Sequence, residues 1–370
     1  MIVLTSHGSY VNGKIYEPPV NTLVEVLISA KSDFLHIRHS IDGSIKSKVY
    51  FYSRGQVRKT TTLDVPQKPT LSRYWGEYKA TVKLFKRLKK RHYIYIGADP
   101  ANAFIGLQLK KKHLIDKLIF YSVDFSDKRF ANPILNATYL AIDKHCARHC
   151  DQVWNVSSRI LSRRTTQGIP ENKNIYVPNA PASPVISRPN HQPGTKLITL
   201  GIISDQLDFK NLFEAIKILL PTFTSIKLTV VGSGPKETEY KSLAQKLNLG
   251  DAVEFTGYLP HHLALKKIQD SDIGLALYNG NWSFNYYGDS MKCREYFTFG
   301  LPVITTDTHS TVEDIVKYKA GIVCPMSPAA YAKAIKTILN HYPEYSQSAI
   351  DLATKYNGIH SRLLKELESL

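Results

Sequence analysis

Short apolar, β-branched runs alternate with longer helical patterns along most of the chain. In the first half the runs cover residues 1–5, 33–39, 92–96, 118–122, 152–156 and 174–177, and in the second half 196–201, 226–231, 253–256, 273–277, 302–305 and 321–324. Helical patterns fill the gaps of the second half at 211–219, 237–247, 261–270 and 328–340. This alternation predicts an α/β protein with parallel sheets that carry helices on both faces.

The clearest boundary is the segment 177–194, VPNAPASPVISRPNHQPG, which contains five prolines and no periodic pattern. A length of 370 residues suffices for two domains with full cores. We therefore expect domains over 1–180 and 181–345, followed by a helical segment over 346–370 that begins near Tyr345. Ligands in such folds bind outside the carboxyl ends of the strands.

Composition narrows the class of protein. No apolar run reaches the roughly 18 residues needed to span a bilayer, and the first residues, MIVLTSHG, have no basic segment ahead of them, so we expect a first strand rather than a signal peptide. Four cysteines without a regular framework indicate a reducing, cytoplasmic setting.

The charge is unevenly distributed. Residues 1–180 hold 29 Lys and Arg against 13 Asp and Glu, whereas residues 181–370 hold 19 against 18, so +16 of the net +17 lies in the first half. The basic residues concentrate at 83–92 and 110–113. This asymmetry predicts a polyanionic partner, which could be nucleic acid, an anionic membrane surface or an acidic glycan, although each cluster alone could be a solvated surface.

The segment 288–306, GDSMKCREYFTFGLPVITT, carries the most specific chemistry. Asp289 or Ser290 can cap a short helix, which Gly300 and the following Pro302 end before a buried strand. Lys292 and Glu295, three residues apart, share one face near the positive end of that helix. A cation, a carboxylate and backbone N–H groups together suit a nucleotide diphosphate, with Glu295 accepting from the ribose hydroxyls.

Three neighbouring segments have compatible patterns. LITLGIISDQLDFKNLFEAI (197–216) predicts a strand, a loop and a helix beginning near Lys210. KLTVVGSGPKE (227–237) ends a strand in Gly-x-Gly-Pro, which permits close approach of the chain to a ligand or a neighbouring loop. VEFTGYLPHHLALKKIQDSDIGLALY (253–278) places Gly257, Tyr258 and Leu259 after another strand, where Tyr258 could stack on a base.

Together these segments resemble retaining GT-B glycosyltransferases, especially family 4 and its relatives. The resemblance implies two Rossmann-like domains facing a central cleft, with the C-terminal helix crossing back to the first domain. It implies a nucleotide-sugar donor, with UDP favoured by family frequency, and a glycan or lipid-linked acceptor bound by the first domain. It also implies retention of configuration and no need for a metal or other cofactor.

The resemblance assigns roles to particular residues. Asp124, Lys210 and Lys292 would be catalytic: the two lysines would neutralise the leaving diphosphate, and Asp124, beside Arg129 at a strand end, would approach the sugar or the acceptor. The residues expected to bind the donor are Gly8, Ser204, Lys210, Gly257, Tyr258, Leu259, Ser290, Met291, Lys292 and Glu295.

The chain departs from the family pattern at three places. Ser204 stands where the family has an arginine, and Tyr287 replaces a glutamate that usually approaches the sugar. A loop over residues 6–19 with the single Gly8 replaces a Gly-Gly turn. Contacts to the sugar would therefore come from Asn285, Tyr286, Asp289 and Ser290, and the identity of the sugar stays open.

Other chemistries fit less well. KHCARHCD (144–151) spaces two His and two Cys at i, i+4, but these ligand types lie on adjacent helix faces and zinc takes about four ligands, so we expect no metal site. A nucleotide-sugar epimerase of GT-B architecture would need carboxylates and His in its cleft for proton transfer, and Asp124 is the only good candidate for such a group that the sequence offers. A nucleic-acid-binding protein would explain the charge but not the Lys–Glu motif, so we expect peripheral docking on an anionic membrane instead.

Overall fold

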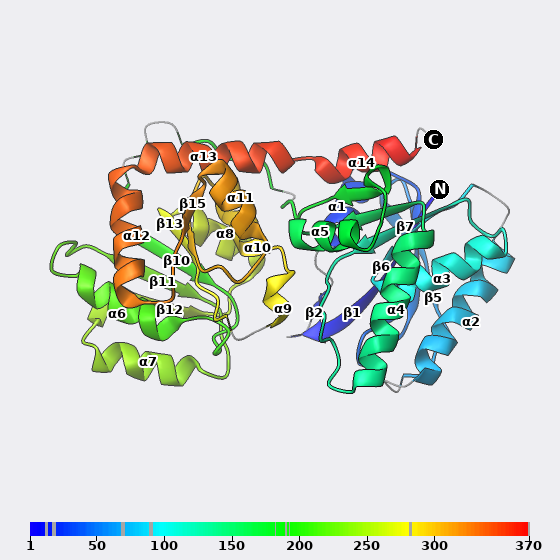
Figure 1. The fold of residues 1–370 in the computed structure, drawn as a ribbon, viewed down its shortest axis with the longest axis horizontal. Coiled ribbons are helices and arrows are strands. Elements are labelled where there is room, and N and C mark those ends of the chain that lie inside the picture. The colour runs from blue at the N-terminus through cyan, green and yellow to red at the C-terminus, as the bar shows by residue number, and fades with distance from the viewer. Residues whose placement is uncertain are drawn as a thin grey trace. The chain divides into compact units, whose positions relative to one another are not determined.

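The computed structural model describes residues 1–11, 14–16, 20–67, 71–88, 92–181, 183–188, 191, 193–280 and 283–368. The chain divides into two compact units, which we call the first domain (1–178 with 358–370) and the second domain (179–357) (Figure 1). Both are α/β units built around a sheet of largely or wholly parallel strands, so the predicted fold class is confirmed.

The first domain contains a mixed sheet in the order β5-β4-β3-β1-β6-β7-β8-β9, with β2 paired to β1. Its elements are β1 (Ile2–Val11), β2 (Lys14–Tyr16), α1 (Val20–Ser29), β3 (Phe34–Ser40), β4 (Lys48–Ser53), β5 (Gln56–Thr62), α2 (Leu71–Arg87), β6 (Ile94–Ala98), α3 (Pro100–Lys111), β7 (Lys117–Ser122), α4 (Pro133–His149), β8 (Gln152–Asn155), α5 (Ser158–Thr166), a 3₁₀ turn (Glu171–Lys173), β9 (Asn174–Tyr176) and α14 (Ile359–Glu368).

Strands β3, β1, β6, β7, β8 and β9 run parallel, and β7 is buried almost throughout because helices cover both faces of the sheet. Helix α3 packs against β6 and β7 and lies between α2 and α4, whereas α1 contacts α14. The order β3-β1-β6-β7-β8 corresponds to the flavodoxin-like doubly wound arrangement, whose strand order reverses between β1 and β6.

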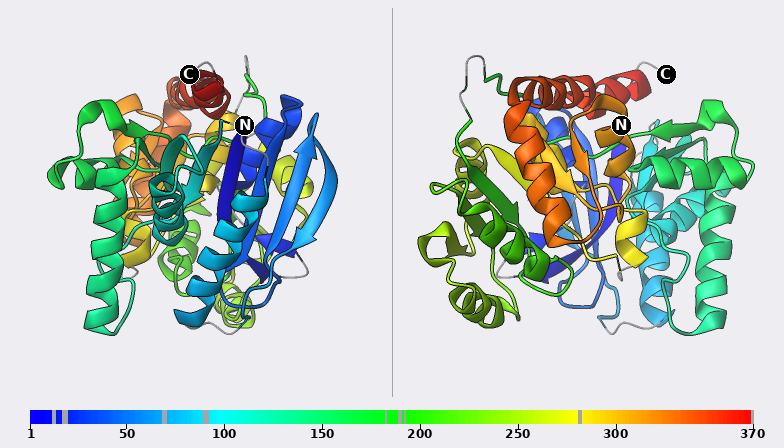
Figure 2. Two further views of the ribbon diagram at one scale, coloured as in Figure 1. Left: turned by 90° about the vertical axis from the view of Figure 1, so that its right-hand side faces the viewer. Right: turned by 60° about the vertical axis from the view of Figure 1, so that its left-hand side comes forward.

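The antiparallel hairpin β4–β5 at one edge of this sheet is missing from the sequence prediction (Figure 2). Its turn residues Arg54 and Gly55 both have positive φ, 51° and 73°, as a two-residue type I′ turn requires. Strand β5 is almost wholly exposed and polar, so it gives no apolar run. The sequence signal available for this hairpin was the dipeptide Arg54-Gly55, which lies between the two strand segments.

The second domain has a wholly parallel sheet in the order β12-β11-β10-β13-β14-β15. Its elements are β10 (Lys196–Leu200), α6 (Phe209–Leu219), β11 (Lys227–Val231), α7 (Glu237–Lys246), a 3₁₀ turn (Gly250–Ala252), β12 (Val253–Gly257), α8 (His261–Gln269), β13 (Ile273–Ala276), α9 (Ser283–Tyr286), α10 (Met291–Thr298), β14 (Val303–Thr305), α11 (Thr311–Tyr318), β15 (Gly321–Val323), α12 (Pro328–Asn340) and α13 (Tyr342–Tyr356). This is the Rossmann strand order, which reverses between β10 and β13.

Two predicted segments differ in detail. The helical segment from Tyr345 is two helices, α13 in the second domain and α14 in the first, because Gly358 adopts a φ of +71° between them. In the proline-rich segment 177–194, residues 182, 189, 190 and 192 lie outside the described part, residues 177 and 178 belong to the first domain, and the described residues from Asn179 onward belong to the second domain. There the N–H of Ile186 donates to the carbonyl of Thr298 at 2.8 Å.

Candidate functional site

In the second domain, candidate residues gather where the strand order reverses. Gly201 follows β10, Tyr278 follows β13, and the N-terminus of α10 lies beside them: the Tyr278 and Ser290 hydroxyls are 2.9 Å apart. Ser290 is the N-cap of α10, since its side chain accepts from the N–H of Cys293. Of the two predicted caps, Ser290 therefore fills the role. A helix N-terminus at a topological switch point is the standard place for a phosphate in this fold.

Glycines make this edge of the sheet compact. Gly232, after β11, has a φ of +134°, and a Cβ atom there would lie 2.0 Å from the carbonyl oxygen of Gly201. The N–H of Gly232 donates to the carbonyl of Gly257 at 2.9 Å. The predicted close approach at Gly-x-Gly is thus to neighbouring loops, and any side chain at Gly232 would push the ends of β10 and β11 apart.

Lys292 occupies the centre of this arrangement. Its partly buried side chain places Nζ 4.6 Å from the centre of the Tyr278 ring. A Cβ built on Gly201 would lie only 3.0 Å from the same Nζ, so the glycine leaves room for the ammonium group. Burial lowers the pKa of Lys292 to about 8. At neutral pH Lys292 is therefore a cation with little solvation, positioned beside a helix N-terminus.

The other residues predicted to bind the donor differ in how far their side chains are exposed to solvent. Glu295 is mostly buried and lies 2.8 Å from Nε2 of the exposed His261, a partner that the sequence prediction omitted. Tyr258 is 56% exposed after β12, whereas Leu259 packs partly into the core. Lys210 is exposed in the first turn of α6. Ser204 and Met291 are both half-buried.

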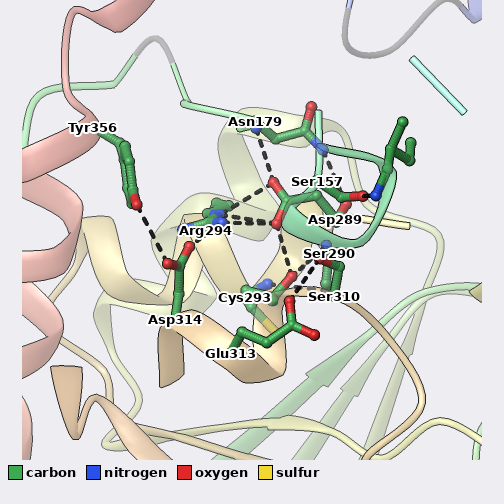
Figure 3. Close-up of polar contacts among 12 residues, drawn as sticks. Ser157, Asn179, Asp289, Ser290, Cys293, Arg294, Ser310, Glu313, Asp314 and Tyr356 are labelled. Carbon is green, nitrogen blue, oxygen red and sulfur yellow. Dashed lines mark hydrogen bonds and ion pairs between the residues drawn. The ribbon is translucent and has the colours of Figure 1, made fainter. Parts of the chain in front are cut away.

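A buried ion-pair network fixes the start of α10, and the sequence prediction missed its centre, Arg294. Figure 3 shows the guanidinium of Arg294 between Asp289, at 2.8 Å, and Asp314, at 2.6 Å. Asp289 also accepts from the hydroxyl of Thr311 and from the backbone N–H of Asn179, both at 2.8 Å. Asp289, one of the residues expected to contact the sugar, thus anchors α10 in this structure. Its buried side chain is engaged by three partners.

The first domain has its own cluster where its strand order reverses, between β1 and β6. Nδ1 of His7 lies 2.6 Å from Asp99, and Nε2 lies 3.1 Å from the buried Glu77 of α2. Burial disfavours the charged ring, but the carboxylates of Asp99 and Glu77 raise the pKa of His7 well above its usual value. Asp99 has a φ of +96°, a strained backbone for a non-glycine residue.

The sequence prediction did not include His7, Asp99 or Glu77. Their signal was positional, because Asp99 directly follows the buried strand β6 and His7 lies in β1, two residues beyond its last pairing with β6. The neighbouring prediction of a loop over 6–19 is wrong where the structure describes it. Gly8 lies inside β1, paired with Ser40 of β3, because β1 continues to Val11 and turns back into β2. Residues 12, 13 and 17–19 of that segment lie outside the described residues.

A cleft of about 810 Å³ opens beside this cluster, a volume typical of sites for small molecules. Asp124 lines it, two residues beyond β7 and 2.5 Å from Arg129, so the predicted proximity of these two side chains is confirmed. The walls are mostly apolar and come from α2, α3 and α4 and the loops before them; they include Tyr74, Trp75, Tyr78, Phe104, Ile105, Phe130, Leu135, Tyr139 and Ile142.

Two further results concern metals and membranes. Within the described residues, no three His, Cys, Asp or Glu side chains gather closely enough to hold a metal ion. In the segment 144–151, Cys146 and Cys150 are buried in the core, whereas the ring centres of His145 and His149 lie 4.2 Å apart nearer the surface, with the rings tilted by 36°. A search of the same described part of the chain finds no helix with the length and apolarity to cross a membrane.

Comparison with known proteins supports the predicted fold of the chain and the predicted resemblance of its second domain to glycosyltransferases. The chain is 24% identical over 218 residues to WcaL of Escherichia coli strain K12, a proposed colanic acid biosynthesis glycosyltransferase. The match covers 57% of this chain and 52% of WcaL. The chain thus spans about half the length of this curated relative, and less of the others it matches.

Solved structures match over the whole chain at low sequence identity. Sucrose-phosphate synthase from Thermosynechococcus elongatus gives a TM-score of 0.66 with 15% identity and covers 100% of this chain and 99% of its own. Anabaena Alr3699/HepE in complex with UDP gives 0.67 with 13% identity and full coverage of both chains. These likenesses confirm the GT-B fold, whereas assignment to family 4 stays a prediction. Residues 187–355, which lie in the second domain, match the model of glycosyl transferases group 1.

Proposed function

We propose that this chain transfers a sugar from a nucleotide sugar, with UDP as the nucleotide, to a glycan or lipid-linked acceptor in cell-surface polysaccharide or glycoconjugate synthesis. The observation that carries the proposal is Lys292 at the switch point of the second domain, beside the N-terminus of α10. The family match, the relation to WcaL and the likeness to a UDP-bound neighbour support the same reaction class.

In this proposal the second domain stabilises the leaving diphosphate. Lys292 and the backbone N–H groups of α10 contact the phosphate oxygens, and Lys210, exposed at the start of α6, provides a second cation. Negative charge that develops on the diphosphate in the transition state then meets positive groups already in position. Such electrostatic stabilisation of the transition state is usually the largest single contribution to catalysis. No metal ion is needed for this role.

The stereochemical part of the proposal is retention. The acceptor hydroxyl would attack from the face that the diphosphate leaves, and the departing phosphate oxygen would take the hydroxyl proton. This route requires no separate general base. Glu295 would accept hydrogen bonds from the ribose, and the nearby His261 would orient the Glu295 carboxylate.

Peripheral binding to an anionic membrane, at its cytoplasmic face, is the further part of the proposal. The basic residues Lys83, Lys86 and Arg87 end α2, and Lys110 and Lys111 end α3, while residues 89–91 of the predicted cluster lie outside the described part. Each cation near such a surface contributes about 1 kcal/mol. Cosedimentation with anionic liposomes at low salt tests this part, and failure to sediment would remove it.

The donor site is tested by calorimetric titration with UDP, GDP and ADP. We expect one nucleotide, UDP, to bind, and Glu295→Ala to weaken that binding sharply because the ribose loses its acceptor. Glu239→Ala, on the exposed surface of α7, is the matched control and should bind like the parent chain. Equal binding by the Glu295→Ala variant would contradict the assigned donor site.

A nucleotide-sugar epimerase is the second candidate, because the cleft of the first domain holds more titratable groups than the sequence suggested. His7, Asp99 and Asp124 all line it. Both ring nitrogens of His7, however, face carboxylates, which leaves neither free to accept a proton from a substrate. Incubation with UDP-sugars in D₂O separates the candidates: an epimerase incorporates deuterium into the sugar ring, and a transferase does not.

A further inference from the structure

We propose that the cleft of the first domain binds the hydrocarbon chain of an amphiphilic acceptor, a sugar linked to an alkyl or isoprenoid chain. As an acceptor site the cleft depends on the proposed transferase function. The proposal goes further by selecting the lipid-linked class over the free glycan. The evidence is the separation of charged and apolar side chains along the cleft.

The charged groups of the cleft gather at one end. Its four ionisable acid and base side chains are His7, Asp99, Asp124 and Arg129. His7 and Asp99 are paired at 2.6 Å, and Asp124 and Arg129 at 2.5 Å. Asp99, Asp124 and Arg129 lie beyond the carboxyl ends of β6 and β7, and His7 lies inside β1, two residues beyond its last pairing with β6. Hydroxyl groups of a sugar are therefore best accommodated at this end.

The remainder of the cleft has few groups that could bind a glycan. Its walls are mostly aromatic and aliphatic side chains, and the hydroxyl of Thr138 already donates to the carbonyl of Ile134. The other polar groups there are the amide of Gln108 and the hydroxyls of Tyr74, Tyr78 and Tyr139. A glycan placed there would lose more hydrogen bonds to water than these few groups replace, at a cost for each unpaired polar group. A hydrocarbon chain loses nothing polar on entry and gains free energy in proportion to its buried area.

The apolar surface continues outward from the cleft. Phe104 and Phe130 are each 38% exposed, Leu135 is 42% exposed, and Ile134 beside it is 77% exposed. Phe104 lies in the second turn of α3, Ile134 and Leu135 in the first turn of α4, and Phe130 in the loop before α4. Trp75 of α2 is 57% exposed on the cleft wall. A chain longer than the cleft would therefore still lie against apolar side chains as it leaves.

The basic clusters are not part of this surface. Helices α2 and α3 start at the carboxyl edge of the sheet, where the cleft opens, and the basic residues of their last turns, Lys86, Arg87, Lys110 and Lys111, lie at the other end. Two other cations of α2 lie nearer the cleft: Arg73 pairs with Glu77, and Nζ of Lys79 lies 5.3 Å from the centre of the Trp75 ring. Twelve residues separate Trp75 from Arg87, which corresponds to about 18 Å along the helix. Binding of the hydrocarbon chain and attraction to an anionic bilayer are thus carried by different residues and can be tested separately.

The test uses glucose and its n-alkyl glucosides of six, eight and ten carbons, titrated into the full chain below their micelle concentrations. We expect affinity to rise by up to about tenfold for each two carbons added. Leu135→Gln and Phe104→Gln should each lower the affinity for decyl glucoside about tenfold. Val57→Gln is the matched control, because Val57 is an exposed apolar residue on β5, outside the cleft, and it should have no effect.

Affinity that does not depend on chain length would overturn the proposal, as would an equal loss in the Val57→Gln variant, which would indicate general adsorption. Circular dichroism and thermal unfolding verify that each variant folds. UDP is titrated into the same samples, so that failure of the donor site is seen independently. If the chain binds decyl glucoside but does not bind UDP, the transferase function is rejected and the hydrocarbon site is retained. If it binds UDP but shows no dependence on chain length, the hydrocarbon site alone is rejected.

Discussion

The two domains place their candidate sites by one topological rule but line them with opposite chemistry. In the second domain the strand order reverses between β10 and β13, and in the first between β1 and β6. Each reversal leaves a crevice at the carboxyl edge of the sheet, because the connections that follow the two central strands leave toward opposite faces. The first crevice, in the first domain, is bordered by His7 and Asp99, and the second crevice, in the second domain, by Gly201 and Tyr278.

The linings differ in the size and polarity of their side chains. Glycines at the ends of β10, β11 and β12 bring backbone close to backbone, so the second domain offers N–H groups and the central cation Lys292. The first domain instead has aromatic rings from α2, α3 and α4 around an 810 Å³ cleft. A diphosphate suits the former crevice and an apolar chain the latter. The comparison teaches that the strand order fixes where a ligand binds, while the residues that follow the strands decide which ligand.

The largest effect that we expect concerns the support of the second crevice. Arg294→Ala would leave the carboxylates of Asp289 and Asp314 buried without their cation, so the free energy of unfolding should fall by about 3–5 kcal/mol. Urea unfolding measures this change. Lys241→Ala, which removes an exposed ion pair with Glu237, should cost no more than about 0.5 kcal/mol. Equal effects of the two substitutions would show that the network does not hold α10 in place.

The next effect concerns the charge of the second crevice. Lys292→Ala removes a charge-assisted hydrogen bond to phosphate, which is typically worth about 1.5–3 kcal/mol, so UDP should bind about 10- to 100-fold more weakly. Lys210→Ala should have a smaller effect because Lys210 is exposed. Lys217→Ala, further along α6 and also exposed, serves as the control in the same titration. A Lys292→Ala variant with the affinity of the parent chain would refute the central role of this residue.

The second domain was the more predictable of the two because its signals are local. The capped start of α10, the Lys–Glu pair and the Gly-x-Gly turn each lie within a few residues, so the sequence shows them directly. What it concealed were partners from distant segments. His261 reaches Glu295 across 34 residues, and Asn179 reaches Asp289 across 110. No periodicity or spacing encodes such contacts.

The first domain was predicted less completely because its cluster is assembled from long-range contacts. His7 meets Glu77 of α2 and Asp99 after β6 only when the sheet has formed. The predicted loop at 6–19 ignored that a strand held by β3 and β6 can continue beyond its apolar run, and the exposed β5 hid the hairpin. The alternation of strands and helices therefore predicts the fold well. Polar residues near strand ends can be recognised as one site only when the order of the strands in the sheet is known.

A pH titration gives the next largest effect and sharpens the assignment of the cation. With a pKa of about 8 in the free chain, Lys292 is protonated at pH 7 and mostly neutral at pH 9. A bound diphosphate raises that pKa, so UDP affinity should fall by about tenfold between pH 7 and pH 9, while the phosphate, with a second pKa near 6, stays ionised. Calorimetry at both pH values measures this, and Lys292→Arg should abolish the dependence because arginine stays charged.

The smallest effect concerns the first crevice and the stability of its polar end. Because the folded-state pKa of His7 is raised, its ion pairs with Asp99 and Glu77 contribute fully below the unfolded-state pKa, near 6.5, and are lost as the pH rises through the folded value. The parent chain should therefore lose its stability advantage over His7→Gln as the pH rises. Thermal unfolding of both chains at several pH values from 6 upward gives the difference, in which groups common to both, including Lys292, cancel. A difference that does not change with pH would mean that His7 has the same pKa in the folded and unfolded chains. A difference that instead grows in favour of the parent chain as the pH rises would mean that His7 is neutral in the folded chain, and the polar end of the cleft would then carry a net negative charge.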